Sequence, residues 1–256
     1  MAGMDQFLQE IRLKRNRVPD FRRYPFSIPA VRKLEVLELN PRVTFFVGDN
    51  GTGKSTLLEA VAVNFGFNPE GGSRNFAFST YASHSCLSEY LLLVKGARRP
   101  RDGYFFRAES FYNVATNIEE LDAGPGLGGP PISASYGGNL HERSHGESFF
   151  ALLNNRLGGD GLYLFDEPEA ALSPLRQLSM LCRLKELTDN GSQCLIATHS
   201  PILMSFPGST IYQFSQEGVR RQRYEETDQF RITRDFLNRY PQMLAELFSE
   251  EPEHRR

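Results

Sequence analysis

The sequence has 256 residues, of which 40% are hydrophobic, enough for one sizeable α/β core. Lysine and arginine number 29 against 31 acidic residues, and the net charge of −2 gives no general argument for a nucleic-acid or anionic-membrane partner. Cys86, Cys182 and Cys194 are scattered without C-x-x-C spacing, so the sequence suggests neither a disulfide framework nor a zinc site. Without a signal-peptide pattern or an apolar run near the roughly 18 residues that span a bilayer, we expect a cytoplasmic protein with no transmembrane segment of its own.

The first forty residues are interrupted by prolines. Residues 5–17 read as a basic amphipathic segment, and residues 34–39 alternate loosely, which predicts an antiparallel strand. Tyr24 and Phe26 are aromatic residues upstream of a glycine-rich loop. Either could stack on an adenine ring, or both could simply pack beneath the N-terminal strands.

The glycine-rich loop begins at Gly48, directly after an apolar strand predicted over residues 42–47, and fits the phosphate-binding pattern G-x-x-x-x-G-K-[ST]. Its glycines let successive backbone N–H groups point at a polyphosphate, and a helix is predicted to follow. We expect Lys54 to reach the β- and γ-phosphates and the Ser55 hydroxyl to ligate Mg²⁺. The predicted nucleotide-binding residues of the loop are Asp49, Asn50, Gly51, Thr52, Gly53, Lys54, Ser55 and Thr56.

The middle of the chain predicts two strands, 88–94 and 103–107, around a basic turn at residues 98–101. That turn, Arg-Arg-Pro-Arg, could contact the phosphate backbone of a nucleic acid, or its charges could simply be solvated in a hairpin loop. A helix is predicted from residue 111 to residue 121.

A second apolar strand, residues 161–167, ends in the carboxylates Asp166 and Glu167. In a parallel sheet its end would bring Asp166 to the Mg²⁺ held by Ser55 and Glu167 to the attacking water, whose proton it could accept. The alternative is that the two acids cap the next helix, because Pro168 is typical of a helix start.

The last third predicts a helix over 174–188 and a buried strand over 193–197 that ends just before His199. A histidine leaving a central strand at the same sheet edge as the acids is positioned to meet a γ-phosphate, although many such histidines are structural. A hairpin over 210–224 and a helix over 233–248, interrupted near Pro241, complete the chain.

The phosphate loop, then Asp-Glu-Pro-Glu-Ala, then Ala-Thr-His-Ser-Pro resemble, in that order, the ABC-type ATPase superfamily, in particular small soluble ATPases akin to RecF, SMC and OLD-family heads. The resemblance covers nearly the whole chain. It implies an α/β P-loop NTPase fold with a mostly parallel sheet flanked by helices, an antiparallel β subdomain and a small helical lobe. We expect one domain over residues 1–256, with the lobe at about 111–147 and a C-terminal hairpin and helix at about 209–248.

The resemblance also implies roles for single residues. Lys54, Glu167 and His199 would be catalytic, with Glu167 as the base and His199 as the switch histidine, while Ser55 and Asp166 would ligate Mg²⁺. Residues 144–147 look like the family's signature, in which Ser144 and Gly146 would contact ATP across a dimer interface, although a histidine replaces one glycine. Residues 170–173 look like the D-loop, without its usual aspartate. Between the phosphate loop and the signature there is no Q-loop glutamine, and Glu109 is the candidate substitute as a Mg²⁺ ligand.

The function implied by the resemblance is ATP hydrolysis in a head-to-tail, ATP-dependent homodimer that acts on nucleic acid or a partner protein, in DNA repair, genome maintenance or defence. The stretch between Lys54 and Ser144 is too short for a long coiled-coil arm. Two alternatives stay open: the ATP-binding subunit of a membrane transporter, and a nucleotide-binding switch that hardly hydrolyses. The sequence does not exclude GTP as the nucleotide.

Overall fold

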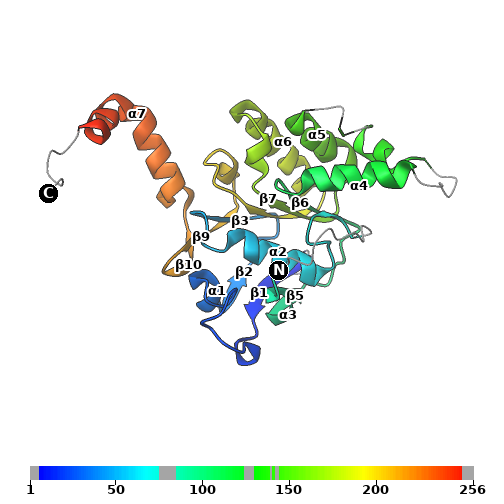
Figure 1. The fold of residues 1–256 in the computed structure, drawn as a ribbon, viewed down its shortest axis with the longest axis horizontal. Coiled ribbons are helices and arrows are strands. Elements are labelled where there is room, and N and C mark those ends of the chain that lie inside the picture. The colour runs from blue at the N-terminus through cyan, green and yellow to red at the C-terminus, as the bar shows by residue number, and fades with distance from the viewer. Residues whose placement is uncertain (1–5, 75–84, 124–129, 139, 142–143, 250–256) are drawn as a thin grey trace.

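The computed structural model describes residues 6–74, 85–123, 130–138, 140–141 and 144–249, and its centre is a seven-stranded sheet (Figure 1). The five inner strands run parallel, and the strand at each edge pairs antiparallel with its neighbour. The predicted mostly parallel α/β sheet is therefore confirmed. In spatial order the strands are β10 (Gly218–Gln222), β9 (Thr210–Ser215), β3 (Val43–Gly48), β8 (Gln193–Ala197), β7 (Gly161–Asp166), β6 (Asp102–Arg107) and β4 (Gly72–Ser73).

The central strands β3, β7 and β8 are buried along their whole length. Successive side chains of a strand point to opposite faces, and Phe45 and Phe46 accordingly belong to two different hydrophobic clusters. Each face of the sheet therefore has its own core. Two buried faces explain why these strands read as continuous apolar runs in the sequence.

Helices cover both faces of the sheet (Figure 1). On one face lie α4 (Phe111–Ala123), α5 (His145–Ala151) and α6 (Pro174–Asp189), whose buried residues share a core with Phe45. On the other lie α2 (Lys54–Phe65), α1 (Pro29–Arg32) and α3 (Leu87–Tyr90), with the core that contains Phe46. The predicted helices after the phosphate loop, from residue 111 and from residue 174 are confirmed.

A three-stranded antiparallel sheet lies on the α2 side and is formed by β2 (Val36–Glu38), β1 (Leu8–Leu13) and β5 (Leu91–Lys95), in that order. The basic segment expected over residues 5–17 contributes its central strand. The antiparallel strand predicted over residues 34–39 is confirmed. Of the two aromatic residues considered for adenine stacking, Phe26 is buried against Tyr90, with ring centroids 4.8 Å apart, and Tyr24 is exposed.

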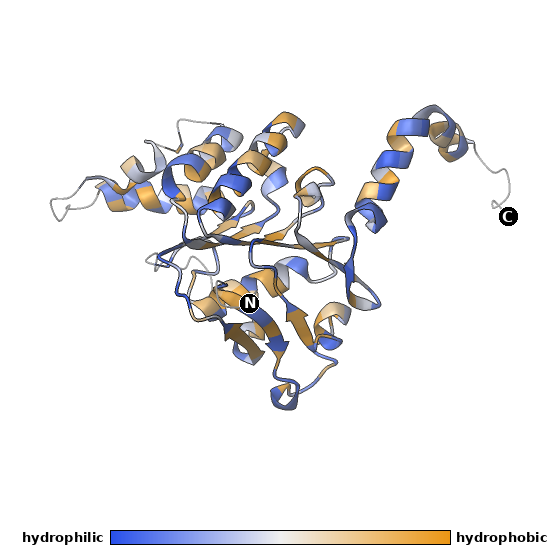
Figure 2. Ribbon diagram, turned by 180° about the vertical axis from the view of Figure 1, so that it is seen from behind, coloured by the Kyte–Doolittle hydropathy of each residue, from blue (hydrophilic) through white to orange (hydrophobic). Residues whose placement is uncertain are grey.

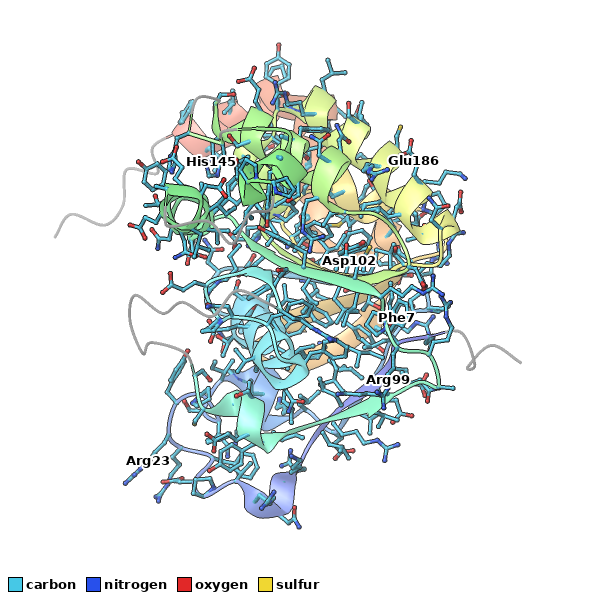
Figure 3. All side chains as sticks on the ribbon, turned by 90° about the vertical axis from the view of Figure 1, so that its right-hand side faces the viewer. Phe7, Arg23, Arg99, Asp102, His145 and Glu186 are labelled. Atoms are coloured by element: carbon cyan, nitrogen blue, oxygen red, sulfur yellow. The ribbon has the colours of Figure 1, made fainter. Side chains whose placement is uncertain are left out.

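The hairpin expected around the basic turn is wrong, because β5 belongs to the small sheet and β6 to the large one. Figure 3 shows Arg99 on the side of the small sheet and Asp102, where β6 begins, at the level of the central sheet. Within the connection, Arg98 and Arg101 both form ion pairs with Asp160. A partner carboxylate thus offsets part of the positive charge that suggested nucleic-acid contact.

The C-terminal hairpin of β9 and β10 and the helix after it are confirmed. The helix, α7 (Asp228–Phe248), starts earlier than predicted because Thr227 caps it, accepting a hydrogen bond from the Phe230 N–H. Arg239 has a non-helical backbone near Pro241, where the interruption was expected. Among the described residues, no helix is both long and apolar enough to cross a membrane.

Candidate nucleotide site

The phosphate loop joins the end of β3 to the start of α2, and its backbone needs glycine at two positions. Gly48 has φ +138°, and a Cβ there would lie 2.2 Å from the Phe214 carbonyl oxygen. Gly53 has φ +98° at the N-cap of α2, and a Cβ there would lie 2.7 Å from Ile28. Only glycine adopts this left-handed backbone without strain and leaves the neighbouring chain in place.

Lys54 lies inside the loop with only 3% of its surface exposed. Its Nζ donates to the carbonyl oxygens of Gly48 at 2.8 Å and Asp49 at 2.9 Å. Burial lowers the pKa of Lys54, while the nearby carboxylates of Glu167 and Asp166 oppose that shift. The Lys54 amino group thus lies at the centre of the loop. The Thr52 hydroxyl also bonds the Asp49 carbonyl, at 2.7 Å, whereas Asn50 and Gly51 are exposed at the tip.

Ser55 and Asp166 meet directly, although one begins α2 and the other ends β7. The Ser55 hydroxyl donates to Asp166 Oδ1 at 2.8 Å. Burial raises the pKa of Asp166 to about 6, against the lowering effects of this hydrogen bond and of the Arg107 charge. Hydroxyl and carboxylate oxygens suit Mg²⁺, which usually keeps waters and phosphate oxygens as its other ligands. The described residues include no cluster of three or more His, Cys, Asp or Glu that could hold a metal.

Glu167 and His199 follow neighbouring strands and lie side by side, with His199 Nε2 3.5 Å from Glu167 Oε1. Glu167 has a left-handed backbone (φ 51°), and its N–H donates to the Ala197 carbonyl at 2.9 Å. A non-glycine residue in this region is strained, and such strain often marks functional sites. Within the described structure the Glu167 side chain makes no helix-capping hydrogen bond, which argues against the capping alternative.

Arg107 is the residue of this site that the sequence analysis missed. It ends β6 and pairs in register with Asp166 on β7. Its guanidinium lies 2.9 Å from Glu59 Oε2, 3.6 Å from Asp166 Oδ2 and 3.7 Å from Glu109 Oε2. Arg107 thus donates a hydrogen bond to Glu59, and its positive charge lies beside the second oxygen of Asp166 while the first accepts from Ser55. The sequence offered one indication of its role, because Arg107 is the last residue of a strand that the sequence predicts.

Glu109, the proposed substitute for the Q-loop glutamine, follows β6 and precedes α4 as expected. Its side chain is 85% exposed and contacts Arg107, and no hydrogen bond or ion pair of the described structure joins it to Ser55 or Asp166. Arg107 thus contacts both Glu109 and Asp166, and the role of Glu109 as a Mg²⁺ ligand stays a prediction.

The segment resembling the signature forms the start of α5. Ser144 is its N-cap: its hydroxyl accepts from the Glu147 N–H, and its own N–H donates to Glu147 Oε2 at 2.9 Å. Gly146 packs so closely on the segment resembling the D-loop that a Cβ would lie 2.6 Å from the Ala171 carbonyl oxygen. Figure 3 shows His145 among the helices of the lobe. In the described residues, no hydrogen bond or ion pair links Ser144 or Gly146 to the phosphate loop.

Two parts of the sequence match family models, and both models describe AAA domains. Residues 20–94, which include the phosphate loop, match an AAA domain. Residues 148–205, which include Asp166 and His199, match an AAA domain described as a putative AbiEii toxin of a type IV toxin–antitoxin system. The segments that carry the phosphate loop and the Asp166 strand are thus each similar to AAA domains. None of the curated proteins matches the sequence.

Solved structures similar to this chain include an SMC head and ABC cassettes. The SMC head domain from Thermotoga maritima is 16% identical, with a TM-score of 0.41 over 85% of this chain and 98% of that one. The cbiO1 protein from Clostridium perfringens, part of an ABC transporter complex, is 16% identical, with a TM-score of 0.45 over 84% and 91%. A dimeric bacterial ABC transporter cassette is 16% identical, with a TM-score of 0.43 over 76% and 91%.

Proposed function

We propose that this protein binds Mg-ATP and hydrolyses it at the interface of a head-to-tail homodimer, driving a conformational cycle in DNA repair, genome maintenance or defence. The observation that carries the proposal is the 2.8 Å hydrogen bond between Ser55 and Asp166, with Glu167 and His199 at the ends of neighbouring strands. A phosphate loop, a pair of oxygen ligands and a carboxylate base then lie together on one edge of the sheet.

Each residue of this group has a task in the proposed reaction of ATP with water to ADP and phosphate. Lys54 leaves the Gly48 and Asp49 carbonyls and donates to the β- and γ-phosphates, where its charge offsets theirs. Ser55 and Asp166 hold Mg²⁺, which, when bound, neutralises charge on the phosphate oxygens. Glu167 accepts a proton from the attacking water, and His199, next to it, donates to the γ-phosphate.

The exposed signature segment supports the dimeric arrangement. Ser144 is exposed and its hydroxyl bonds within its own capping box, away from the phosphate loop of the same chain. A second copy, placed head to tail, would bring this hydroxyl and the Gly146 amide to the γ-phosphate. Because the two copies are identical, the same contact would form twice and enclose two nucleotides.

The experiment that tests this function measures the mass of a Glu167→Gln variant in solution, with and without Mg-ATP, by light scattering. Blocking hydrolysis should trap the closed dimer, and the Lys54→Ala variant is the control that should not respond. A mass indifferent to ATP in a variant that demonstrably binds ATP would reject the dimeric site. Wild-type protein that binds ATP without turning it over would favour the switch alternative.

A further inference from the structure

Glu169 is the one acidic residue of the Asp-Glu-Pro-Glu-Ala motif to which the proposed reaction gives no task. It lies in a short helical turn, Pro168–Ala171, between the end of β7 and the start of α6. Figure 2 shows hydrophobic residues in the elements on both faces of the central sheet, and the polar groups of the site follow where β7 and β8 end. The contacts of Glu169 indicate what a further carboxylate does at this edge.

The Glu169 side chain reaches the backbone of the segment that follows the neighbouring strand. Its Oε1 accepts a hydrogen bond from the His199 N–H at 2.5 Å. The bond joins the turn after β7 to the segment after β8, and a hydrogen bond from a backbone N–H to a carboxylate is among the stronger ones in proteins. Glu169 therefore fixes the direction of the His199 amide group.

This contact replaces a bond that the sheet would otherwise supply. Where the parallel pairing of β7 and β8 ends, the Glu167 N–H donates to the Ala197 carbonyl. Continued by two residues, the same pattern would take the His199 N–H to the Glu167 carbonyl. Glu167 has instead a left-handed backbone, and its carbonyl accepts from the Ala170 N–H at 3.1 Å. The Glu169 carboxylate takes the place of the missing acceptor.

The residues on either side of His199 have anchors of their own. The Thr198 N–H donates to a carbonyl of β3 at 3.0 Å, and the Ser200 hydroxyl donates to Gln177 Oε1 on α6. Loss of the Glu169 side chain would thus leave the ends of this segment in place and free the amide group of His199 itself. Rotation of that peptide group changes φ of His199, and with it the direction of the imidazole ring.

The ring of His199 faces the other carboxylate of the site. Its Nε2 lies 3.5 Å from Glu167 Oε1 and is buried without a hydrogen-bond partner in the described part of the chain. The second oxygen of Glu169, Oε2, is likewise buried without one. Buried polar atoms without partners are rare in native proteins and lower their stability, so a functional reason explains this pair better than a structural one.

We propose that Glu169 is a positioning residue, which fixes the backbone of His199 so that its ring faces the γ-phosphate. This inference rests on the proposed function, in which His199 donates to that phosphate. The alternative is an electrostatic role: burial lowers the pKa of Lys54, and the carboxylates that oppose this shift include Glu169. The two roles use different properties of the side chain, since positioning needs an acceptor atom and electrostatics needs the charge.

The turnover of ATP by three variants separates these roles. Glu169→Ala removes the acceptor and should lower kcat about 30-fold while KM changes less than about twofold, because a misplaced group slows the reaction more than it weakens binding. Glu169→Gln keeps an acceptor oxygen without the charge and should stay within about threefold of the wild type. The matched control, Glu226→Ala, removes a carboxylate that also accepts a backbone N–H, that of Arg223, and should change neither constant.

A double-mutant cycle shows whether Glu169 acts through His199. In the His199→Ala background, Glu169→Ala should reduce kcat by less than about threefold, because the group that it positions is already absent. An equal loss with and without His199 would overturn the proposal. An equal loss in Glu169→Gln and Glu169→Ala would overturn it as well, since it would assign the effect to the charge near Lys54.

A measurement without nucleotide tests the positioning directly. Isotope-labelled histidine gives a backbone amide NMR signal for each of the five histidines, and His199→Ala identifies the signal of His199. In Glu169→Ala this signal should move upfield, and its N–H should exchange with solvent at least about tenfold faster. Glu169→Gln should keep most of the protection. An unchanged signal and exchange rate in Glu169→Ala would contradict the proposal.

Failure of this inference and failure of the proposed function give different results. A wild type that does not hydrolyse ATP rejects the proposed function, and the amide signal then decides whether Glu169 holds His199. A wild type that hydrolyses ATP no faster than Glu169→Ala rejects this inference alone. Circular dichroism checks that each variant keeps its fold. If Glu169→Ala does not fold, the activity of Glu169→Gln decides between the acceptor and the charge.

Discussion

Two regions of the proposed site differ in how much of their environment comes from the same chain. The phosphate side consists of the phosphate loop with Lys54, Ser55 and Asp166, and the signature side consists of residues 144–147 at the start of α5. Lys54 and Asp166 are 3% and 5% exposed, and each is held by contacts from other elements of the same chain. Ser144 is exposed and bonds within its own helical turn. In the proposed function, the buried Lys54 and Asp166 would act within one copy, and the exposed Ser144 would act across the interface with a second copy. The difference indicates which half of the proposed site is complete before any assembly.

The largest expected effect is on the phosphate side. Lys54→Ala removes the buried cation at the centre of the loop, so nucleotide affinity should fall by about 100-fold in a titration with a fluorescent ATP analogue. Ser144→Ala should leave that affinity nearly unchanged in the monomer. Two results would contradict this difference: ATP hydrolysis that persists in Lys54→Ala, or an equal loss of nucleotide affinity in Lys54→Ala and Ser144→Ala.

Arg107 tests how the phosphate side is held together. Arg107→Gln leaves the largely buried carboxylates of Glu59 and Asp166 without their counter-charge and should reduce the free energy of unfolding by about 2 kcal/mol in urea denaturation. Arg107→Lys should recover part of this loss because it keeps the charge but not the fork. The control is Arg223→Gln, which breaks exposed ion pairs and should change stability by less than about 0.5 kcal/mol. Equal effects at the two arginines would contradict the structural role of Arg107.

The pH dependence of stability should reveal the burial of Asp166. Its pKa is about 6 in the folded protein against an ordinary value of 3.8, so the folded state binds the proton more tightly. Ionisation of Asp166 therefore destabilises the folded protein. This effect grows as pH rises from 3.8 to about 6 and is complete above pH 6. Asp166→Asn should therefore raise the free energy of unfolding by about 2 kcal/mol at neutral pH, and the gain should shrink toward pH 4. Thermal unfolding of the wild type and of Asp166→Asn, with a chelator and no nucleotide, measures this difference in stability. A stabilisation that does not change with pH would show that the ionisation of Asp166 is not its cause.

The smallest effect is expected on the signature side, where two roles of Ser144 can be separated. Ser144→Ala removes the α5 cap and should cost about 1 kcal/mol of stability. Ser144→Asn keeps a capping side chain but removes the hydroxyl, and Ser144→Thr keeps both. If the hydroxyl acts across a dimer, ATP-dependent dimerisation should weaken about tenfold in the asparagine variant and persist in the threonine variant. An asparagine variant that dimerises normally would leave Ser144 as a helix cap alone.

Much of the fold and the phosphate side could be predicted from local patterns. The apolar runs that became β3, β7 and β8 are continuous because both faces of these strands are buried. The glycines at 48 and 53 mark left-handed backbone that other residues rarely adopt. Helices α2, α4 and α6 lie where their periodicity indicated. In each case the signal lies within a few residues of the element that it specifies.

The errors arose where distant segments meet. The strands over residues 91–95 and 102–107 were expected to form a hairpin because they are adjacent in the chain, but β5 pairs with β1 and β6 pairs with β7. Arg107 escaped notice for the same reason, since its importance comes from its register with Asp166 on another strand. The role of Glu109 as a Mg²⁺ ligand, chosen by its place between a strand and a helix, stays a prediction.

By itself, the sequence determined that this chain has a phosphate loop, a strand that ends at Asp166 with Glu167 directly after it, and a strand that ends before His199. These features depend on backbone angles and apolar burial that neighbouring residues impose. Only the tertiary structure decided that Ser55 bonds Asp166, that Arg107 lies against the same carboxylate, and that α7 extends from the body with none of its residues buried. Such contacts join residues far apart in the chain, because they depend on which strands become neighbours in the sheet and on how the first turn of α7 is anchored.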